Sequence, residues 1–214
     1  MIIVIDGPAG SGKSSTARAV AEQTGIQFLD SGAFYRAITL IYIQVNCDKA
    51  AFFDALKTYD VTFQFKNGVF HVFLNGTEVT ELLREQRVSE MVSEVATMNE
   101  AREFVNAHLR EVVKSGDFIA DGRDLGTAVF PDADYKFYFV ADIQERARRR
   151  FEEMTTTGLD ADLNQIIANI NERDRKDSSR EIAPLRKADD AVEVDTGKMT
   201  LEEQVQFVID QVRH

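Results

Sequence analysis

Cysteine, long apolar runs and histidine are all scarce in this chain, and each scarcity excludes a class of protein. The 214 residues include one cysteine, Cys47, which cannot form an internal disulfide and fits a reducing cytosol. The longest apolar runs, such as 137–141, are far too short to cross a membrane, and the N-terminus lacks the basic start of a signal peptide. We therefore expect a cytoplasmic protein without a membrane partner. The three histidines, His71, His108 and His214, are too scattered to predict a metal site.

Positive charge is also in short supply, with 25 lysines and arginines against 36 aspartates and glutamates and a net charge of −11. A nucleic-acid polymer needs an extended positive surface, so this balance argues against such a partner. The arginines are concentrated, however, because eight of the 16 lie between Arg146 and Arg186. This segment therefore favours a compact anion as the ligand.

The composition is that of an ordinary globular protein, with 44% hydrophobic residues and only three prolines, and it predicts one large domain. Short apolar runs predict buried strands at 1–5, 26–29, 118–120, 135–140 and 191–194. Helical spacing of apolar residues predicts helices at 14–24, 33–45, 81–97, 101–114, 143–154, 162–176 and 200–212. This alternation predicts an α/β fold whose five-stranded parallel sheet is flanked by helices. No exposed apolar helix stands out, so we expect a monomer.

Residues 60–80 break the alternation of strands and helices. Apolar residues alternate with polar ones at Val61, Phe63 and Phe65, as on a half-buried strand. Two Asn-Gly pairs, at 67–68 and 75–76, are typical of tight turns between antiparallel strands. We predict a small antiparallel-sheet insert in this part of the chain.

The pattern G-x-x-x-x-G-K-[ST] of a phosphate-binding loop is matched completely by Gly7-Pro8-Ala9-Gly10-Ser11-Gly12-Lys13-Ser14. Glycines let the backbone curl so that several N–H groups point at one phosphate, and the following helix adds its positive N-terminal end. Lys13 can reach the β- and γ-phosphates, and the Ser14 hydroxyl can bind Mg²⁺. The loop follows a predicted strand and opens a predicted helix, as such loops require. We expect ATP, with Mg²⁺, to bind at this loop and at the next residue, Ser15.

A phosphate-binding loop alone does not choose among the classes of nucleotide-binding protein. A GTPase is disfavoured, because neither Asn-Lys-x-Asp nor Asp-x-x-Gly occurs in the chain. An ATPase motor is normally larger. A small chain with an insert and an arginine-rich segment favours a small-molecule kinase.

Two polar segments follow other predicted strands, so they share the carboxyl edge of the sheet, where open α/β proteins bind ligands. Residues 30–36 combine a hydroxyl, an aromatic ring and a guanidinium. Residues 121–124 place Arg123, which can clamp a phosphate, beside Asp124, which would repel one. The predicted helix 162–176 carries an apolar stripe on one face, formed by Leu163, Ile166 and Ile170. At the same helical spacing, charged residues continue this stripe toward and beyond the end of the helix: Arg173, Asp177 and Arg180. Such a charged continuation of a buried stripe is expected to enter a cleft.

Together these residues resemble the cytidylate kinase family of nucleoside monophosphate kinases along nearly the whole chain. The matching segments are 5–14, 29–36, 121–127, 129–133, 173–180 and 183–185, of which 121–124 and 173–180 are much more specific than the phosphate loop. The resemblance implies a single kinase domain with the P-loop NTPase fold, whose core comprises residues 1–59 and 115–214. It also implies a monophosphate-binding insert at about 60–114 and a lid at about 150–165.

The resemblance further implies that the γ-phosphoryl group of ATP is transferred to CMP, and to dCMP. By matching position, Ser93, Arg102 and Asp124 look like readers of cytosine, and Arg36, Arg123 and Arg173 look like the clamp on the acceptor phosphate. Asp177 and Arg180 look like ribose contacts, and Ser31 and Tyr35 look like the lining of the acceptor site. Asp124 can accept from the amino group of cytosine, whereas uracil would present an acceptor there. A buried mismatch of this kind discriminates strongly between substrates.

A phosphate acceptor is largely dianionic at neutral pH, because its second pKa is about 6. No general base is needed, so catalysis reduces to positioning and charge neutralisation by Lys13, Arg123 and Arg173, together with Mg²⁺. One or more of Arg146, Arg149 and Arg150, which precede the expected lid, could also reach the transferring group.

Two alternatives remain open from the sequence. The chain could be a kinase of the same architecture with another acceptor, such as UMP, AMP or a small metabolite. It could also be a nucleotide-binding module without phosphoryl-transfer activity.

Overall fold

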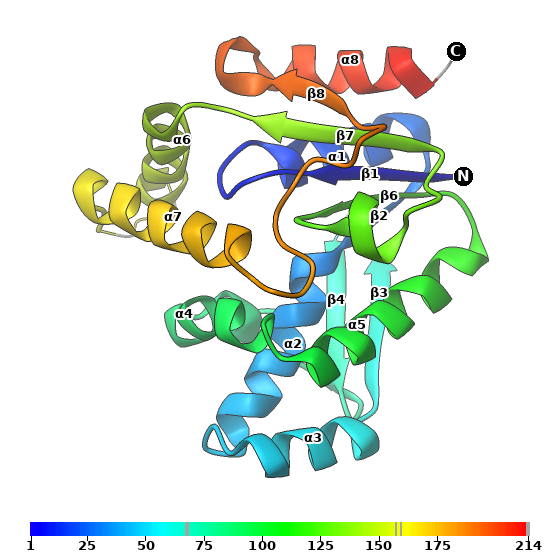
Figure 1. Cartoon of the computed structure of the whole chain (residues 1–214), viewed down its shortest axis with the longest axis vertical. Helices are drawn as coiled ribbons and strands as arrows, with labels where there is room; N and C mark the ends of the chain where they lie inside the picture. Colours follow the sequence, from blue (N-terminus) through cyan, green and yellow to red (C-terminus); the bar gives the residue numbers. More distant parts are fainter. Residues whose placement is uncertain (67–68, 157, 159, 213–214) are drawn as a thin grey trace.

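A five-stranded sheet forms the centre of the molecule (Figure 1). The computed structural model describes residues 1–214 except 67–68, 157, 159 and 213–214. The strands are β1 (Ile2–Asp6), β2 (Gln27–Asp30), β6 (Phe118–Gly122), β7 (Tyr135–Val140) and β8 (Val192–Asp195). They lie in the order β2-β6-β1-β7-β8, and every neighbouring pair is parallel. The predicted parallel sheet is confirmed, with strand ends shifted by one or two residues.

Helices cover both faces of this sheet because its strands are apolar on both sides. In β1, Ile3 and Ile5 pack on the side of α1 (Lys13–Thr24) and α8 (Leu201–Val212). Val4 points the other way and packs with residues of α2 (Ser31–Gln44) and α5 (Asn99–Val112). Since successive side chains of a strand alternate between faces, one short apolar run supplies both cores.

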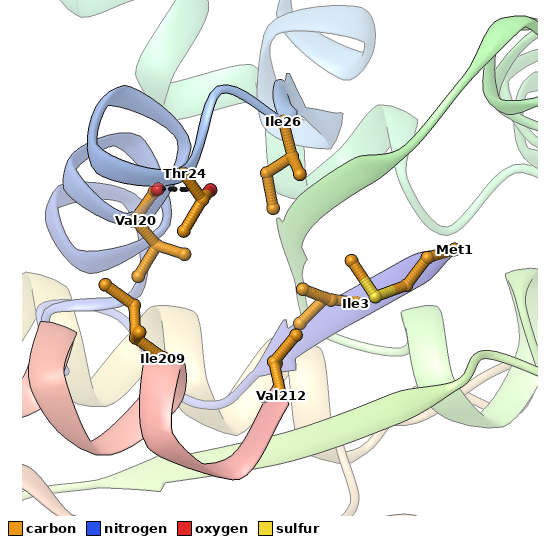
Figure 2. A pocket seen from close by; sticks show the side chains of 7 residues that line it. All are labelled: Met1, Ile3, Val20, Thr24, Ile26, Ile209 and Val212. Carbon is orange, nitrogen blue, oxygen red and sulfur yellow. Dashed lines mark hydrogen bonds between the residues drawn. The ribbon is translucent and has the colours of Figure 1, made fainter. Parts of the chain in front are cut away.

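A small apolar hollow lies where β1 meets α1 and α8, near the start of the strand (Figure 2). It is lined by Met1, Ile3, Val20, Thr24, Ile26, Ile209 and Val212. The Thr24 hydroxyl donates to the carbonyl of Val20 at 2.7 Å, so the only hydroxyl in the lining is already paired. The hollow lies at the amino edge of the sheet and is therefore remote from the phosphate loop.

The second sheet is antiparallel and contains β3 (Val61–Lys66), β4 (Val69–Leu74) and β5 (Thr77–Glu78). The predicted insert is thus confirmed as a separate sheet. Asn75 and Gly76 join β4 to β5 with φ values of 48° and 77°, the left-handed conformation of a tight hairpin. The other predicted turn, at 67–68, lies outside the described residues. Buried side chains of this sheet belong to the same core as α2, so the insert has no core of its own.

The single helix predicted at 81–97 is wrong, because two elements occupy that stretch. A 3₁₀ turn, η1 (Leu82–Arg84), precedes α4 (Gln86–Val95), and Glu85 between them has φ −59° and ψ 145°. An extended residue cannot continue a helix, so the chain turns at Glu85.

The sequence pattern also does not predict α3 (Lys49–Thr58), which is a real helix of the structure. Asp48 caps it by accepting from the backbone N–H of Ala51 at 2.8 Å. Helix α3 packs against α2 and α5 on the side of the molecule that faces away from α8 (Figure 1).

Helices α6 (Ile143–Thr156) and α7 (Leu163–Ser178), together called the α6–α7 pair, lie to one side of the sheet (Figure 1). They share a small apolar cluster of Ala9, Ala147, Ile166 and Ile170, which is separate from the two larger cores. Within the described residues, no helix is long and apolar enough to cross a membrane.

Candidate active site

The phosphate loop connects β1 to α1 in the way that its sequence predicts. Gly7 has φ 147°, and a Cβ atom there would lie 2.2 Å from the carbonyl oxygen of Phe139, so only glycine fits. Gly10 and Gly12 also have positive φ values, 76° and 91°. The buried Lys13 lies across the loop, and its Nζ donates to the carbonyl of Pro8 at 2.6 Å. The loop thus holds an ammonium group inside a ring of backbone atoms.

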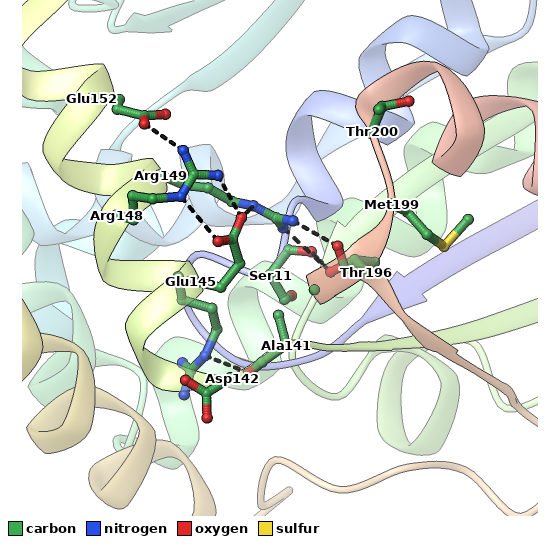
Figure 3. Close-up of polar contacts among 12 residues, drawn as sticks. Ser11, Ala141, Asp142, Glu145, Arg148, Arg149, Glu152, Thr196, Met199 and Thr200 are labelled. Atoms are coloured by element: carbon green, nitrogen blue, oxygen red, sulfur yellow. Dashed lines mark hydrogen bonds and ion pairs between the residues drawn. The ribbon is translucent and has the colours of Figure 1, made fainter.

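One side of the loop is braced by the segment after β8 (Figure 3). The buried hydroxyl of Thr196 donates to the carbonyl of Ser11 at 2.9 Å. Arg149 donates to the carbonyl of Thr196 at 2.6 Å and pairs with Glu145 at 3.0 Å. Arg149 is therefore bound to the wall of the loop.

The other side of the loop is gripped by the α6–α7 pair. Arg146 Nη1 donates to the carbonyl of Ala9 at 2.9 Å, and the N–H of Ala9 donates to Asp174 Oδ1 at 3.0 Å. Arg146 and Asp174 also pair with each other at 2.5 Å. Arg150, by contrast, is exposed and pairs with Glu153 at 2.6 Å. The three arginines that the sequence could not separate thus occupy three different environments.

Ser14 and Asp121 bring oxygen atoms together beside the loop. The Ser14 hydroxyl donates to Asp121 Oδ2, while the buried Asp121 Oδ1 has no hydrogen-bond partner. Burial, and then the nearby carboxylate of Asp30, raise the pKa of Asp121 to about 6. An unpartnered carboxylate oxygen next to a hydroxyl can hold a hard cation. No cluster of three or more His, Cys, Asp or Glu side chains that could bind a metal occurs in the described part of the chain.

The junction of β2 and α2 carries the first segment expected to bind the acceptor. Asp30 caps α2 by accepting from the N–H of Ala33 at 2.8 Å, and it pairs with Arg36 at 2.9 Å. The Ser31 hydroxyl donates to the carbonyl of Asp121 at 2.6 Å, which ties this junction to the end of β6. The expected acceptor residues Ser31 and Arg36 therefore lie beside the end of β6, where Asp121 is located.

Positive charge gathers between the phosphate loop and α7. Arg123 pairs with Asp177 at 3.0 Å, and Arg180 donates to the carbonyl of Asp177 at 3.2 Å. The buried Nε of Arg173 has no hydrogen-bond partner, and neither has the buried Nη2 of Arg180. Burial and the neighbouring guanidinium of Arg123 lower the pKa of Arg173 to about 10. The pKa of Lys13 is lowered by the same two causes. Cations that destabilise one another in this way define a site for an anion.

Two of the expected base-reading residues, Arg102 and Asp124, meet in a buried ion pair. Asp124 pairs with Arg102, and Arg180 lies 3.8 Å from its other oxygen. Arg102 also lies over the ring of Tyr35, whose buried hydroxyl has no hydrogen-bond partner. Burial raises the pKa of that hydroxyl to about 12. Ser93, the remaining expected reader, is buried on α4.

Two further carboxylates at the site, besides Asp30 and Asp121, were not assigned a role from the sequence. Asp6, at the end of β1, accepts from the N–H groups of Leu125 at 3.0 Å and Gly126 at 2.7 Å. It thereby joins the phosphate loop to the turn that follows Asp124, and burial raises its pKa to about 6. Asp174, described above, is the other. Asp6 directly precedes the phosphate loop, and Asp174 directly follows Arg173. These positions next to motif residues are the sequence signal that could have identified both carboxylates.

Comparison with solved structures supports the fold. A shikimate kinase from Bacteroides thetaiotaomicron matches with a TM-score of 0.52 at 12% identity, covering 100% of this chain and 99% of that one. An uncharacterized protein from Eubacterium ventriosum matches with a TM-score of 0.56 at 14% identity, covering 100% and 98%. Together with the phosphate loop and the sheet order, these likenesses identify the P-loop NTPase fold.

Comparison of sequences is more specific. The family model described as cytidylate kinase matches residues 3–214. The cytidylate kinase of Lactococcus lactis is 40% identical over 99% of this chain and 96% of its own length. The cytidylate kinase of Salinibacter ruber is 40% identical over 100% of this chain and 97% of its own length. That of Bacillus pumilus is 43% identical over 97% of this chain and 94% of its own length. The chain is therefore a member of the cytidylate kinase family.

Proposed function

We propose that this chain transfers the γ-phosphoryl group of ATP to CMP or dCMP, giving ADP and CDP or dCDP. One observation carries the proposal: the buried Nε of Arg173 has no hydrogen-bond partner, and this side chain lies beside Arg123 and close to Lys13. Such a cluster of cations favours the binding of an anion that neutralises it. The cluster lies beside the phosphate loop, and Asp177, which pairs with Arg123, is near Asp124, whose carboxylate is suited to cytosine.

The donor binds at the loop of residues 7–15. The N–H groups of the loop and the N-terminus of α1 bind the phosphates, and Lys13 turns from the Pro8 carbonyl toward them. Because the glycines already hold the required backbone shape, the loop needs little rearrangement to bind.

The acceptor binds at the carboxyl edge of the sheet, where it faces the donor. Arg36, Arg123 and Arg173 clamp its phosphate, Asp177 and Arg180 contact its ribose, and Ser31 and Tyr35 line the site. With both reactants held, the transferring group moves between two phosphates whose charge Lys13, Arg123 and Arg173 neutralise. The acceptor phosphate is already ionised, so the reaction requires no general base.

The base is read by Ser93, Arg102 and Asp124. Asp124 accepts from the amino group of cytosine, and Arg102 donates to its ring acceptors. Residues 60–114 form the monophosphate-binding insert, and a lid at about 150–165 closes over the donor to exclude water. We further propose that the protein works as a cytoplasmic monomer.

Mg²⁺ fits beside the phosphate loop, because the free Asp121 Oδ1 and the Ser14 hydroxyl are hard oxygen donors next to the triphosphate site. Ser14 and Asp121 would hold the ion. When bound, it neutralises charge on the β- and γ-phosphates.

Replacing Asp121 with asparagine should raise the Mg²⁺ concentration that gives half-maximal turnover by about tenfold, since a charged ligand is lost. In the wild type, acidification should likewise raise the Mg²⁺ concentration that gives half-maximal turnover. Because its carboxyl has a pKa of about 6, the proton competes with the metal below that pH. Activity measured against Mg²⁺ concentration at pH 5.5 and 7.5, with a chelator blank, checks both effects. An Asp121→Asn variant with the wild-type Mg²⁺ requirement would rule out the metal role.

The function is tested by an acceptor screen. The purified chain is incubated with ATP, Mg²⁺ and either CMP, dCMP, UMP, AMP or no acceptor, and ADP release is followed in a coupled assay. We expect rapid turnover with CMP or dCMP alone. Preference for UMP or AMP would indicate a kinase of the same architecture with another acceptor. ATP binding without turnover on any acceptor would indicate a binding module.

A further inference from the structure

Ala9 is held by charged side chains at both of its backbone polar atoms. Its N–H donates to Asp174 Oδ1 at 3.0 Å, and its carbonyl accepts from Arg146 at 2.9 Å. The two side chains belong to different helices, α7 and α6, and pair with each other at 2.5 Å. Arg146 is buried and Asp174 largely so, since their side chains are 9% and 18% exposed. This arrangement, called the Ala9 clamp, fixes one residue of the phosphate loop in both position and orientation.

The same helix that supplies Asp174 also carries residues of the acceptor site. Arg173 and Asp177 lie on α7, on either side of Asp174 in the sequence. Asp177 faces Arg123, whereas Asp174 faces the phosphate loop. Successive residues of an α-helix point about 100° apart, so one turn of α7 can contact both sites. A rigid helix therefore spans the two reactants.

We propose that Asp174, together with Arg146, positions the donor loop relative to the acceptor clamp, so that the Ala9 clamp sets the alignment of the two phosphates. Asp174 and Arg146 are positioning residues in this inference, which rests on the proposed function. Apolar packing strengthens the connection, because Ala9 also contacts the α6–α7 pair through the cluster with Ala147, Ile166 and Ile170. A displacement of α7 relative to Ala9 would leave both substrates bound but misaligned.

Misalignment predicts a particular kinetic signature. Phosphoryl transfer depends on the distance and angle between the two groups, and a shift of about 1 Å can lower the rate about 100-fold. Asp174→Ala should therefore lower kcat by about 100-fold while the separate dissociation constants of ADP and CMP change by less than about threefold. Asp174→Asn keeps an acceptor for the Ala9 N–H but loses the charge that holds Arg146, so its kcat should be intermediate.

The matched control is Arg175→Ala, on the same helix and one residue away. Arg175 is exposed and pairs only along the helix, with Glu172 at 2.9 Å, so this variant should keep the wild-type kcat. A double variant, Arg146→Ala with Asp174→Ala, should lower kcat little more than either single change does, because both side chains act through Ala9. Melting temperatures identify any variant that fails to fold, in which case Asp174→Asn carries the test.

The experiment combines steady-state kinetics with calorimetric titration of ADP and of CMP. Unchanged kcat in Asp174→Ala and Asp174→Asn would overturn the proposal. So would a loss of ADP affinity as large as the loss of kcat, since that would make the clamp a determinant of binding and not of alignment. If the wild type phosphorylates no monophosphate, it is the proposed function that fails, and the two failures are thereby distinguished.

Discussion

Replacing Lys13 with alanine is expected to lower kcat by about a thousandfold, the largest effect of any single substitution considered. Lys13 is the one ammonium group inside the phosphate loop, and its Nζ lies 2.6 Å from the Pro8 carbonyl. No other residue of the loop, 7–15, carries a positive side chain that could neutralise the charge developing on the transferring group. Its removal therefore acts on the transition state more than on the binding of ATP.

The fold should survive this substitution. Burial and the neighbouring Arg123 lower the pKa of Lys13, so the folded protein disfavours the charged form of this side chain. Alanine removes that unfavourable charge, and the melting temperature should stay level or rise. Lys57→Ala is the control, because Lys57 is exposed and pairs only with Asp54 on α3. Near-normal turnover in the Lys13 variant would rule out the assignment of the phosphate loop.

Replacing Asp124 with asparagine should reduce the preference for CMP over UMP by about 100-fold in kcat/KM. The carboxylate can only accept hydrogen bonds, whereas an amide can donate one to the oxygen that uracil presents in place of the cytosine amino group. The change should therefore lower kcat/KM for CMP and raise it for UMP. Kinetics with both acceptors under identical conditions measure the ratio directly.

Stability must be followed alongside, because Asp124 is buried between Arg102 and Arg180. Removing one partner of a buried ion pair typically costs about 3–5 kcal/mol, which is why asparagine is preferable to alanine here. Asp132→Asn, at an exposed position in a neighbouring turn, provides the control for loss of one negative charge. An unchanged CMP-to-UMP ratio in the folded Asp124 variant would contradict its role as reader of the base.

Local patterns predicted the sheet and the phosphate loop because both depend on short-range constraints. Short apolar runs specify the strands of the parallel sheet, and the left-handed φ values of Gly10 and Gly12 specify the loop residues. The end of η1 at Glu85 could not be predicted in this way. Its backbone conformation depends on how η1 and α4 each pack against α2, and the flanking sequence is equally compatible with a continuous helix.

The roles of charged side chains were harder to predict, since they depend on which element each helix faces. Arg146, Arg149 and Arg150 are equivalent on a helical projection, yet they contact Ala9, Thr196 and Glu153 respectively. Asp174 lies off the stripe formed by Arg173 and Asp177, so a search along that stripe misses it. Only the position of the phosphate loop beside α7 reveals its contact.

The separate apolar cluster of the α6–α7 pair has a consequence for how the acceptor clamp is attached to the rest of the molecule. The cluster shares no residue with either large core, whereas the buried residues of the antiparallel sheet belong to the core under α2. Arg173 lies on α7, which is joined to the donor loop by the polar and apolar contacts of Ala9. A substitution that disturbs the loop at Ala9 is therefore transmitted to the acceptor clamp without passing through either core.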